Sequence, residues 1–184
     1  MGKQFDHMDD ATRDFILQQK LFFVASATAA SRVNVSPKGL DCLRVLGPNS
    51  VAYLDRTGSG NETAAHLLAD GRLTLMFCAF DGAPKILRLY GSARSIYRDE
   101  AEYDALLNAH FDGIEPRGAR QIVLQTIDLV QTSCGFAVPL MDFVAERPVL
   151  TKWAESKTDD DLVAYRALKN TTSLDGLPTG LSEK

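Results

Sequence analysis

The stretch that best indicates the fold is RLTLMFCAF-DGAP-KILRLYGSARSIY, residues 72–97. Its first part is almost wholly apolar, as in a buried strand, and its last part alternates apolar and polar side chains. Residues 81–84 between them contain the Asp-Gly and Pro that are typical of a turn. Two strands joined by so short a turn predict a hairpin, and therefore antiparallel pairing.

Outward from this hairpin, similar patterns recur along the chain. Apolar or alternating segments bounded by Gly, Pro and Asn predict further strands at residues 21–27, 32–36, 42–46, 50–54 and 120–133. We expect Pro37 and Gly39 to end the second of these, because Pro cannot donate to a ladder and Gly permits a turn. Amphipathic or acid-capped segments predict helices at residues 6–20, 62–69, 100–111, 149–156 and 159–168.

The number and spacing of the strands indicate the fold class. Six or seven short strands joined by short turns favour an antiparallel barrel or sandwich in one domain, residues 1–184. We expect an N-terminal helix in residues 1–20, the barrel in residues 21–139 and a helical extension in residues 140–184. The tail from Asn170 is rich in Thr, Ser and Gly, so we expect it to be loose.

Composition and charge narrow the class of protein. The 184 residues are 45% apolar and 24% charged, as in globular proteins, and the net charge of −4 argues against a nucleic-acid partner. No apolar run approaches the roughly 20 residues that span a membrane, and the first residues lack the apolar core of a secretory signal. Cys42, Cys78 and Cys134 form no metal-binding or disulfide pattern, so we expect reduced thiols, no metal and a cytoplasmic location.

The first candidate site is DRTGSGNE, residues 55–62, where a strand ends, a glycine-rich turn follows and a helix begins. Free backbone N–H groups and the helix dipole favour an anion at such a point. Arg56 adds a guanidinium suited to phosphate, and Ser59 and Asn61 add side-chain donors. The alternative is a plain turn in which Ser59 or Asn61 caps the helix. The segment matches neither the Walker pattern nor the dinucleotide fingerprint.

Two further candidates come from polar residues in or beside strands. Ser36 and Lys38 lie where the strand at residues 32–36 stops, a position at which ligand contacts are common, although an exposed turn with a Lys is the alternative. Arg88 lies inside the apolar strand at residues 85–97, which indicates either an edge position or an anion beside it.

The fourth candidate is SCGFAVP, residues 133–139, at the end of the last strand. Cys134 and Gly135 are small enough for the backbone to approach a flat ring closely, and Phe136 follows them. The alternative is an ordinary strand exit with a core Phe. No cue in the sequence supplies a base for Cys134, so nothing marks it as a nucleophile.

Taken in order, the four segments resemble the pyridoxamine 5'-phosphate oxidase-like FMN-binding proteins, in the group of members of unassigned substrate. The matching stretches are FFVASATAASRVNVSPKG, VAYLDRTGSGNETAAHLLADGRLTLMFCAF, KILRLYGSAR and SCGFAVP. They span about Leu21 to Pro139, some two-thirds of the chain. The order and spacing of all four carry the match, since no single motif is as specific as a Walker loop.

The resemblance implies a six-stranded antiparallel split β-barrel with Greek-key connections and flanking helices. It also implies a homodimer in which each flavin mononucleotide (FMN) lies in a cleft between the subunits. The implied cofactor-binding residues are Ser36, Lys38, Arg56, Ser59, Asn61 and Arg88, with Cys134, Gly135 and Phe136 covering the flavin ring from the other subunit.

The implied function is that of an FMN-dependent oxidoreductase acting on an unassigned small molecule, with NADH or NADPH as the electron donor. No Arg-rich C-terminal signature is present, since the chain ends in SLDGLPTGLSEK, so the resemblance does not extend to oxidation of pyridoxamine phosphate itself. No residue stands out as a general acid or base. One alternative is a flavin-binding or stress-response protein without turnover. Another is the same fold with deazaflavin or haem, although no His lies beside a predicted cleft segment.

Overall fold

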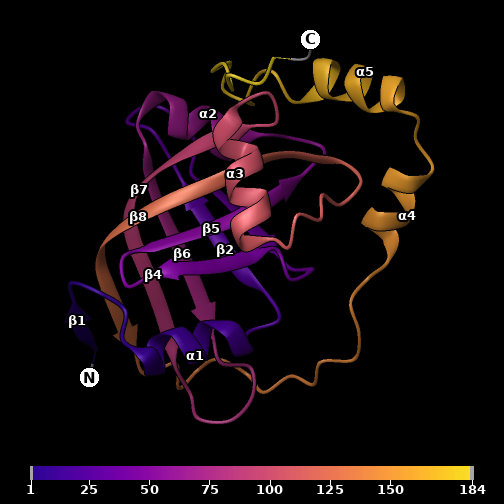
Figure 1. The fold of residues 1–184 in the computed structure, drawn as a ribbon. Helices are drawn as coiled ribbons and strands as arrows, with labels where there is room; N and C mark the ends of the chain where they lie inside the picture. The colour runs from indigo at the N-terminus through magenta and orange to yellow at the C-terminus, as the bar shows by residue number, and fades with distance from the viewer. Residues whose placement is uncertain (1, 183–184) are drawn as a thin grey trace.

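The computed structural model describes residues 2–182 of the chain. Its elements, in chain order, are β1 (Lys3–Phe5), α1 (Asp10–Gln18), β2 (Phe22–Ser26), β3 (Asn34–Lys38), β4 (Leu43–Gly47), β5 (Ser50–Arg56), α2 (Glu62–Ala69), β6 (Arg72–Cys78), β7 (Ile86–Tyr97), α3 (Ala101–His110), β8 (Ala119–Ser133), α4 (Val149–Glu155) and α5 (Asp159–Lys169). Figure 1 shows these elements arranged around one strongly curved sheet, with α1 at one end, α2 at the other and α3 across the outer face of the sheet.

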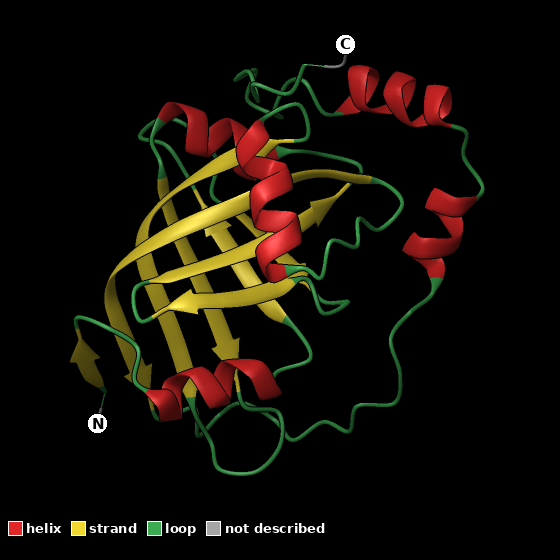
Figure 2. Cartoon of the chain, viewed as in Figure 1, coloured by secondary structure: helices red, strands yellow, loops and turns green. Residues whose placement is uncertain are grey.

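All strand pairs in the sheet are antiparallel, and the order is β3-β2-β6-β7-β8-β5-β4, with β1 added beside β8. The strands β2 and β5 stand far apart in this order, yet the rings of Phe22 and Tyr53 meet with centroids 5.7 Å apart. The sheet therefore curls until its two ends face each other (Figure 2). In the described residues no ladder joins β3 to β4, so the barrel is split between these two strands.

The pairing of β7 with β8 depends on one glycine. The register shifts between Tyr90 and Gly91, which is the point where both long strands bend. A Cβ at Gly91 would lie 1.9 Å from the carbonyl oxygen of Thr126, a distance that no side chain can tolerate. Glycine is therefore required there for the two backbones to approach each other.

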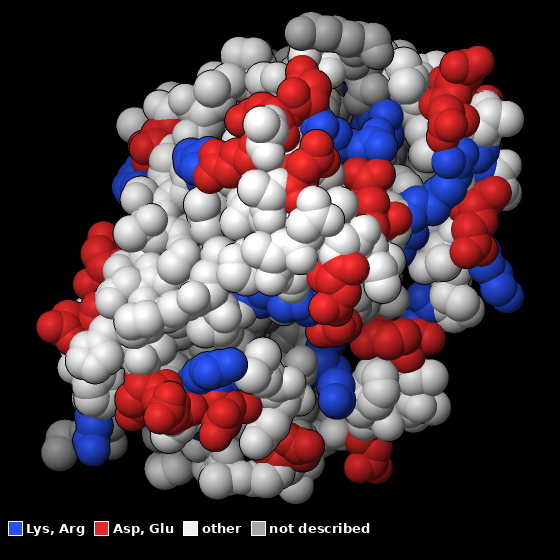
Figure 3. Space-filling view, in the orientation of Figure 1, with Lys and Arg blue, Asp and Glu red and all other residues white. Residues whose placement is uncertain are grey.

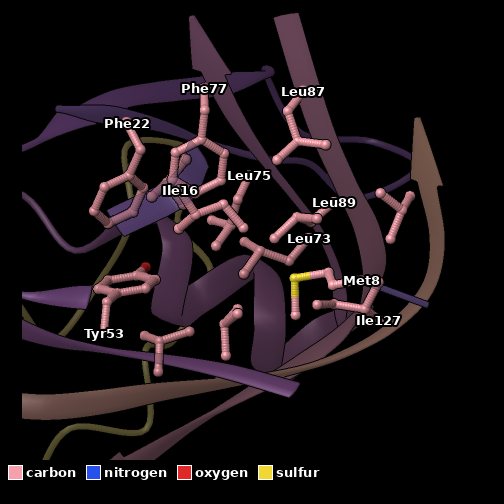
Figure 4. Packing of buried hydrophobic residues seen from close by; sticks show 14 of the residues in the cluster. Met8, Ile16, Phe22, Tyr53, Leu73, Leu75, Phe77, Leu87, Leu89 and Ile127 are labelled. Carbon is pink, nitrogen blue, oxygen red and sulfur yellow. The ribbon is translucent and has the colours of Figure 1, made fainter. Parts of the chain in front are cut away.

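The main hydrophobic core lies inside the curled sheet and is closed at one end by α1 (Figure 4). Alternate residues of each strand point inward, and many of them are fully buried, among them Val24, Leu75 and Leu87. Ile16 from α1 packs on the same cluster. Burial of each such side chain contributes about 1.5–3 kcal/mol.

The antiparallel split barrel was predicted, but two details of the strands differ from the expectation. The sheet has eight strands rather than six, partly because the short strand β1 pairs with β8. In addition, β3 continues through Pro37 and Lys38, where we had expected it to end. Because β3 is an edge strand, Pro37 removes a donor that no neighbour needs.

The helices lie where the sequence patterns placed them; α2 has the predicted ends, and the other helices differ from the prediction at one or both ends. The first is shorter than expected, since Asp9 caps it by accepting from the backbone N–H of Thr12 at 2.7 Å. Thr158 and Asp161 form a reciprocal capping box at the start of α5. Within the part of the chain that the structure describes, no helix has the length and apolar character needed to cross a membrane.

The two segments after β8 depart most from the sequence analysis. Residues 134–148, here called the strap, form neither helix nor strand and run along the outside of the molecule to α4 (Figure 1). We had expected the tail after α5 to be loose, but it is packed on the rest of the chain. Asn170, Ser173 and Thr179 are buried, and a β-bridge joins Thr172 to Pro178.

Candidate functional site

A cavity of about 680 Å³ opens at the split in the barrel, where β3, β4, the end of β5 and the start of α2 come together. This volume is typical of pockets for small molecules and cofactors, roughly 300–1,000 Å³. The apolar part of the lining includes Leu54, Phe111, Ile114 and Leu150. A flat ring system and an attached polar group would both find suitable surfaces here.

One wall of the cavity is the glycine loop, residues 57–61, between β5 and α2. The backbone N–H and the hydroxyl of Thr57 donate to the carbonyl of Gly118, at 2.7 and 2.9 Å. The next six backbone N–H groups, those of residues 58–63, donate to no other described residue. A Cβ at Gly58 would meet no heavy atom within 4 Å, so the space beside the loop is open. Free donors at the start of a helix favour an anionic ligand group.

Beside this loop lies a buried ion cluster of three side chains. Asp55, at the end of β5, accepts from Lys38 Nζ at 2.6 Å and from Arg120 Nε at 2.7 Å. Gln121 Nε2 donates to the same carboxylate at 3.0 Å. Burial alone would raise the pKa of Asp55, but the Arg120 and Lys38 charges outweigh it and hold this pKa far below its usual range. The carboxylate therefore stays ionised and fixes both cations.

Arg120 also connects this cluster to the glycine loop. Its Nη1 donates to the carbonyl of Gly60 at 2.8 Å, and its side chain is almost completely buried. A buried guanidinium with two fixed partners is rigid, so it holds Gly60 at a constant position. The loop is thus anchored to the barrel by the same residue that pairs with Asp55.

Five of the nine predicted site residues line this one cavity, namely Ser36, Lys38, Arg56, Ser59 and Asn61. Ser59 is exposed at the open side, and Ser36 donates to Asn34 Oδ1 at 3.2 Å. The remaining four predicted residues, Arg88, Cys134, Gly135 and Phe136, do not line it.

Arg56 has more internal partners than we expected. Its Nε and Nη2 donate to the carbonyl of Arg117 at 3.1 and 2.8 Å, and its Nη1 donates to Thr151 Oγ1 on α4 at 3.1 Å. The guanidinium therefore docks α4 on the barrel while it borders the cavity. Two of its five N–H groups have no partner among the described residues, and these are the ones left for a ligand.

The Asn61 side chain already has hydrogen-bond partners within the chain. Asn61 is 2% exposed, and its amide donates to the carbonyl of Asn170 at 3.2 Å and accepts from Gln121 at 2.9 Å. It is therefore not available to a phosphate, and it makes no side-chain cap at α2 either. What this position offers a ligand is its backbone N–H.

The other predicted group lies at the far ends of β7 and β8. Arg88 Nη1 donates to Ser133 Oγ at 3.1 Å, and Cys134 lines a second cavity of about 550 Å³ beside α1. Gly135 has a φ of 63°. It lies so close to Lys85 that a Cβ added at Gly135 would be 2.9 Å from the backbone nitrogen of Lys85. Phe136 is 82% exposed, so its ring has no packing partner within this chain.

Sequence analysis missed several residues of the cavity, above all Asp55, Arg120 and Arg44. Asp55 lies next to Arg56 in the quoted motif, and its position directly before a glycine-rich turn was a usable signal. Cys42 also lines the cavity, and burial raises the pKa of this thiol to about 12, so it is protonated at neutral pH. None of the described lining residues is His.

Neither the distribution of charged side chains on the face shown nor the placement of potential metal ligands among the described residues points to a nucleic-acid or metal site. In Figure 3 the Lys and Arg atoms stand mostly beside Asp or Glu atoms, without a continuous basic stripe on the face shown. Among residues 2–182 no group of three or more His, Cys, Asp or Glu is placed to hold a metal ion. The features that point to a ligand therefore gather in the 680 Å³ cavity.

Comparisons with known proteins agree on one family. The sequence model described as "Pyridoxamine 5'-phosphate oxidase" matches residues 8–134. The chain is 41% identical over 191 residues to the "Pyridoxamine 5'-phosphate oxidase family protein ustO" of Aspergillus flavus, and the match covers 95% of this chain and 76% of that protein.

Solved structures show the same fold at lower identity. A putative pyridoxamine 5'-phosphate oxidase from Lactobacillus delbrueckii superposes with a TM-score of 0.54 at 18% identity, over 68% of this chain and 94% of that chain. HupZ of Group A Streptococcus superposes with a TM-score of 0.54 at 19% identity, over 66% and 91%. By the match of sequence and of fold together, this chain belongs to the pyridoxamine 5'-phosphate oxidase family.

Proposed function

We propose that this protein is an FMN-dependent oxidoreductase acting on a small molecule, with the FMN phosphate bound at the glycine loop. The observation that carries the proposal is the run of free N–H groups at residues 58–63, at the edge of a cavity of about 680 Å³. Lys38 and Arg56 add positive charge at the same cavity. Family membership supports FMN as the ligand, since the family resemblance implies this cofactor.

The residues of the cavity have distinct parts in this function. When bound, FMN would supply the chemistry of hydride transfer between a nicotinamide donor and an organic acceptor. The backbone N–H groups of the loop hold the phosphate and so fix the orientation of the cofactor. Leu54, Phe111 and Leu150 present apolar surface to its larger part and exclude water from that side.

The same proposal includes a homodimer with the cofactor between the subunits. The strap carries large apolar side chains that are exposed in the single chain, with Phe136 at 82%, Leu140 at 79% and Val144 at 92%. Exposed apolar surface concentrated in one segment is typical of an interaction site. A second copy of the chain would cover the strap and bring its Phe136 to the open side of the partner's cavity.

An alternative function, flavin binding without turnover, has one observation in its favour. Two titratable groups beside the glycine loop are already bonded to each other, since Lys38 and Asp55 form an ion pair at 2.6 Å. Cys42 remains protonated because burial raises its pKa to about 12. Neither the ion pair nor this thiol is therefore an evident general acid or base.

The test is an absorption spectrum of the freshly purified protein, followed by mass measurement of the released chromophore. Bands of oxidised flavin and the mass of FMN are the expected result, and NADH or NADPH should then bleach them if the protein turns over. Bound FMN that neither donor reduces would favour the binding protein. A deazaflavin or haem mass, or a colourless protein that takes up no added FMN, would contradict the proposal.

A further inference from the structure

The tail after α5 forms a compact unit directly behind the glycine loop. Asn170 ends α5 and is completely buried. The chain then folds back on itself, since Ser173 N–H donates to the carbonyl of Leu177 at 2.8 Å and Thr179 N–H to that of Thr171 at 3.0 Å. We call residues 170–179 the clamp.

The clamp is bonded to both ends of the loop. Asn170 Nδ2 donates to the carbonyl of Gly58 at 2.9 Å, while the carbonyl of Asn170 accepts from Asn61 Nδ2 at 3.2 Å. Thr179 Oγ1 donates to that same carbonyl at 2.7 Å. At the start of α2, the carboxylate of Glu62 accepts from the backbone N–H of Leu174 at 3.0 Å. None of the clamp residues lines the cavity, so the clamp holds the loop from the opposite side.

The bond to Gly58 determines where the next N–H points. In a planar trans peptide the carbonyl and the following N–H point in opposite directions. Because Asn170 binds the carbonyl of Gly58 from behind, the N–H of Ser59 is directed toward the cavity. Arg120, which itself lines the cavity, fixes the next peptide but one by donating to the carbonyl of Gly60.

From these contacts we propose that Asn170 is a positioning residue, which orients the Ser59 N–H toward the phosphate of the bound cofactor. This inference rests on the proposed function, because it takes a phosphate as the ligand of the loop. A loop with two glycines has many conformations, and fixing one of them before binding lowers the entropy cost of binding. The matched family segment ends at residue 134, so the clamp lies outside it.

The test compares FMN with riboflavin, which has the same ring but no phosphate. In Asn170→Ala we expect the Kd of FMN, measured by flavin fluorescence, to rise roughly tenfold, and that of riboflavin by less than about twofold. Asn108→Ala, at an exposed position on α3, is the matched control and should change neither. Unchanged FMN affinity, or equal losses for both flavins, would overturn the proposal.

A second variant and a measurement without flavin keep the test decisive. Thr179→Val removes a hydroxyl bond to Asn170 at nearly constant volume, and we expect the same selective loss for FMN at about threefold. In the flavin-free protein, ¹⁵N relaxation should give lower order parameters for Ser59 and Gly60 in both variants. If the unmodified protein binds neither flavin, the proposed function fails, while the relaxation data still decide whether the clamp orders the loop. Unchanged order parameters would overturn the positioning role.

Discussion

The glycine loop and the strap are both irregular segments of one chain, but they differ in what holds them. The carbonyls of Gly58 and Gly60 each accept from a buried side chain, and Thr57 is bonded to Gly118. The strap has few such bonds, among them the one from Met141 N–H to the carbonyl of Phe80 at 2.8 Å. The loop is therefore held by buried hydrogen bonds within one chain, whereas several large apolar side chains of the strap are exposed.

The difference follows from the chemistry of the two surfaces. A polar loop at a ligand site gains specificity only if its donors are held in place, so its other polar groups must be satisfied by the protein itself. The strap instead exposes apolar side chains, and such surface is stabilised only when a partner covers it. In our proposal these two conditions meet at one cofactor, which the loop binds and the partner's strap covers.

The largest effect is expected for Asp55→Asn, which tests whether the ion cluster supports the glycine loop. This change leaves the buried Arg120 and the partly exposed Lys38 without a counter-charge, and we expect a loss of about 3 kcal/mol or more in the free energy of unfolding. Urea denaturation followed by circular dichroism measures it. Asp128→Asn, at an exposed position on β8, is the control and should stay within about 0.5 kcal/mol of the unmodified protein. An equally small effect of Asp55→Asn would show that the ion cluster does not support the loop.

The second prediction concerns cofactor affinity at the loop. Arg56→Ala should raise the Kd of FMN by roughly ten- to a hundredfold, because charge-assisted hydrogen bonds contribute about 1.5–3 kcal/mol. Arg13→Ala, on the exposed face of α1, is the charge-matched control. Thr151→Val separates the loss of the bond to α4 from the loss of the guanidinium. Equal FMN affinity in Arg56→Ala and Arg13→Ala would remove Arg56 from the site.

How far the sequence predicted these features depends on how local the signals are. The strand end, the glycines and the helix start of the loop lie within eight residues, residues 55–62, so the sequence pattern was sufficient. The residues that fix the loop come from far along the chain. Arg120 is 65 positions from Asp55, and Asn170 is 112 positions from Gly58. A pattern within a few neighbouring residues cannot predict contacts between residues so far apart in the sequence.

The expectation for the tail was wrong, whereas the role expected of residues 133–139 stays a prediction. The tail has the polar composition of a loose segment, but Asn170, Ser173 and Thr179 each make hydrogen bonds and are buried, although Asn170 Oδ1 has no partner among the described residues. The fourth candidate segment follows the end of β8, and Phe136 is exposed and does not line its own chain's cavity.

The third prediction tests whether the exposed apolar side chains of the strap form the interface of the proposed dimer. Val144→Asp places a charge on the most exposed apolar side chain of the strap, and should weaken the proposed dimer at least about tenfold. Sedimentation velocity over a dilution series measures the change. Leu168→Asp, on an exposed residue of α5, is the matched control. A dimer unaffected by Val144→Asp, or one that Leu168→Asp weakens equally, would place the interface elsewhere.

The smallest expected effect is the pH dependence that Asp55 adds to the stability of the loop region. The pKa of Asp55 is lower in the folded state than its unfolded value of about 3.9, so the folded state favours the ionised carboxylate. Its contribution is then fully present above the unfolded pKa and is lost as the pH falls below about 4 toward the folded pKa. The difference in unfolding free energy between the unmodified protein and Asp55→Asn should shrink by about 1 kcal/mol between pH 5 and pH 3. Urea denaturation at both pH values checks this, and a difference that stays constant would mean that Asp55 carries a proton in the ion cluster.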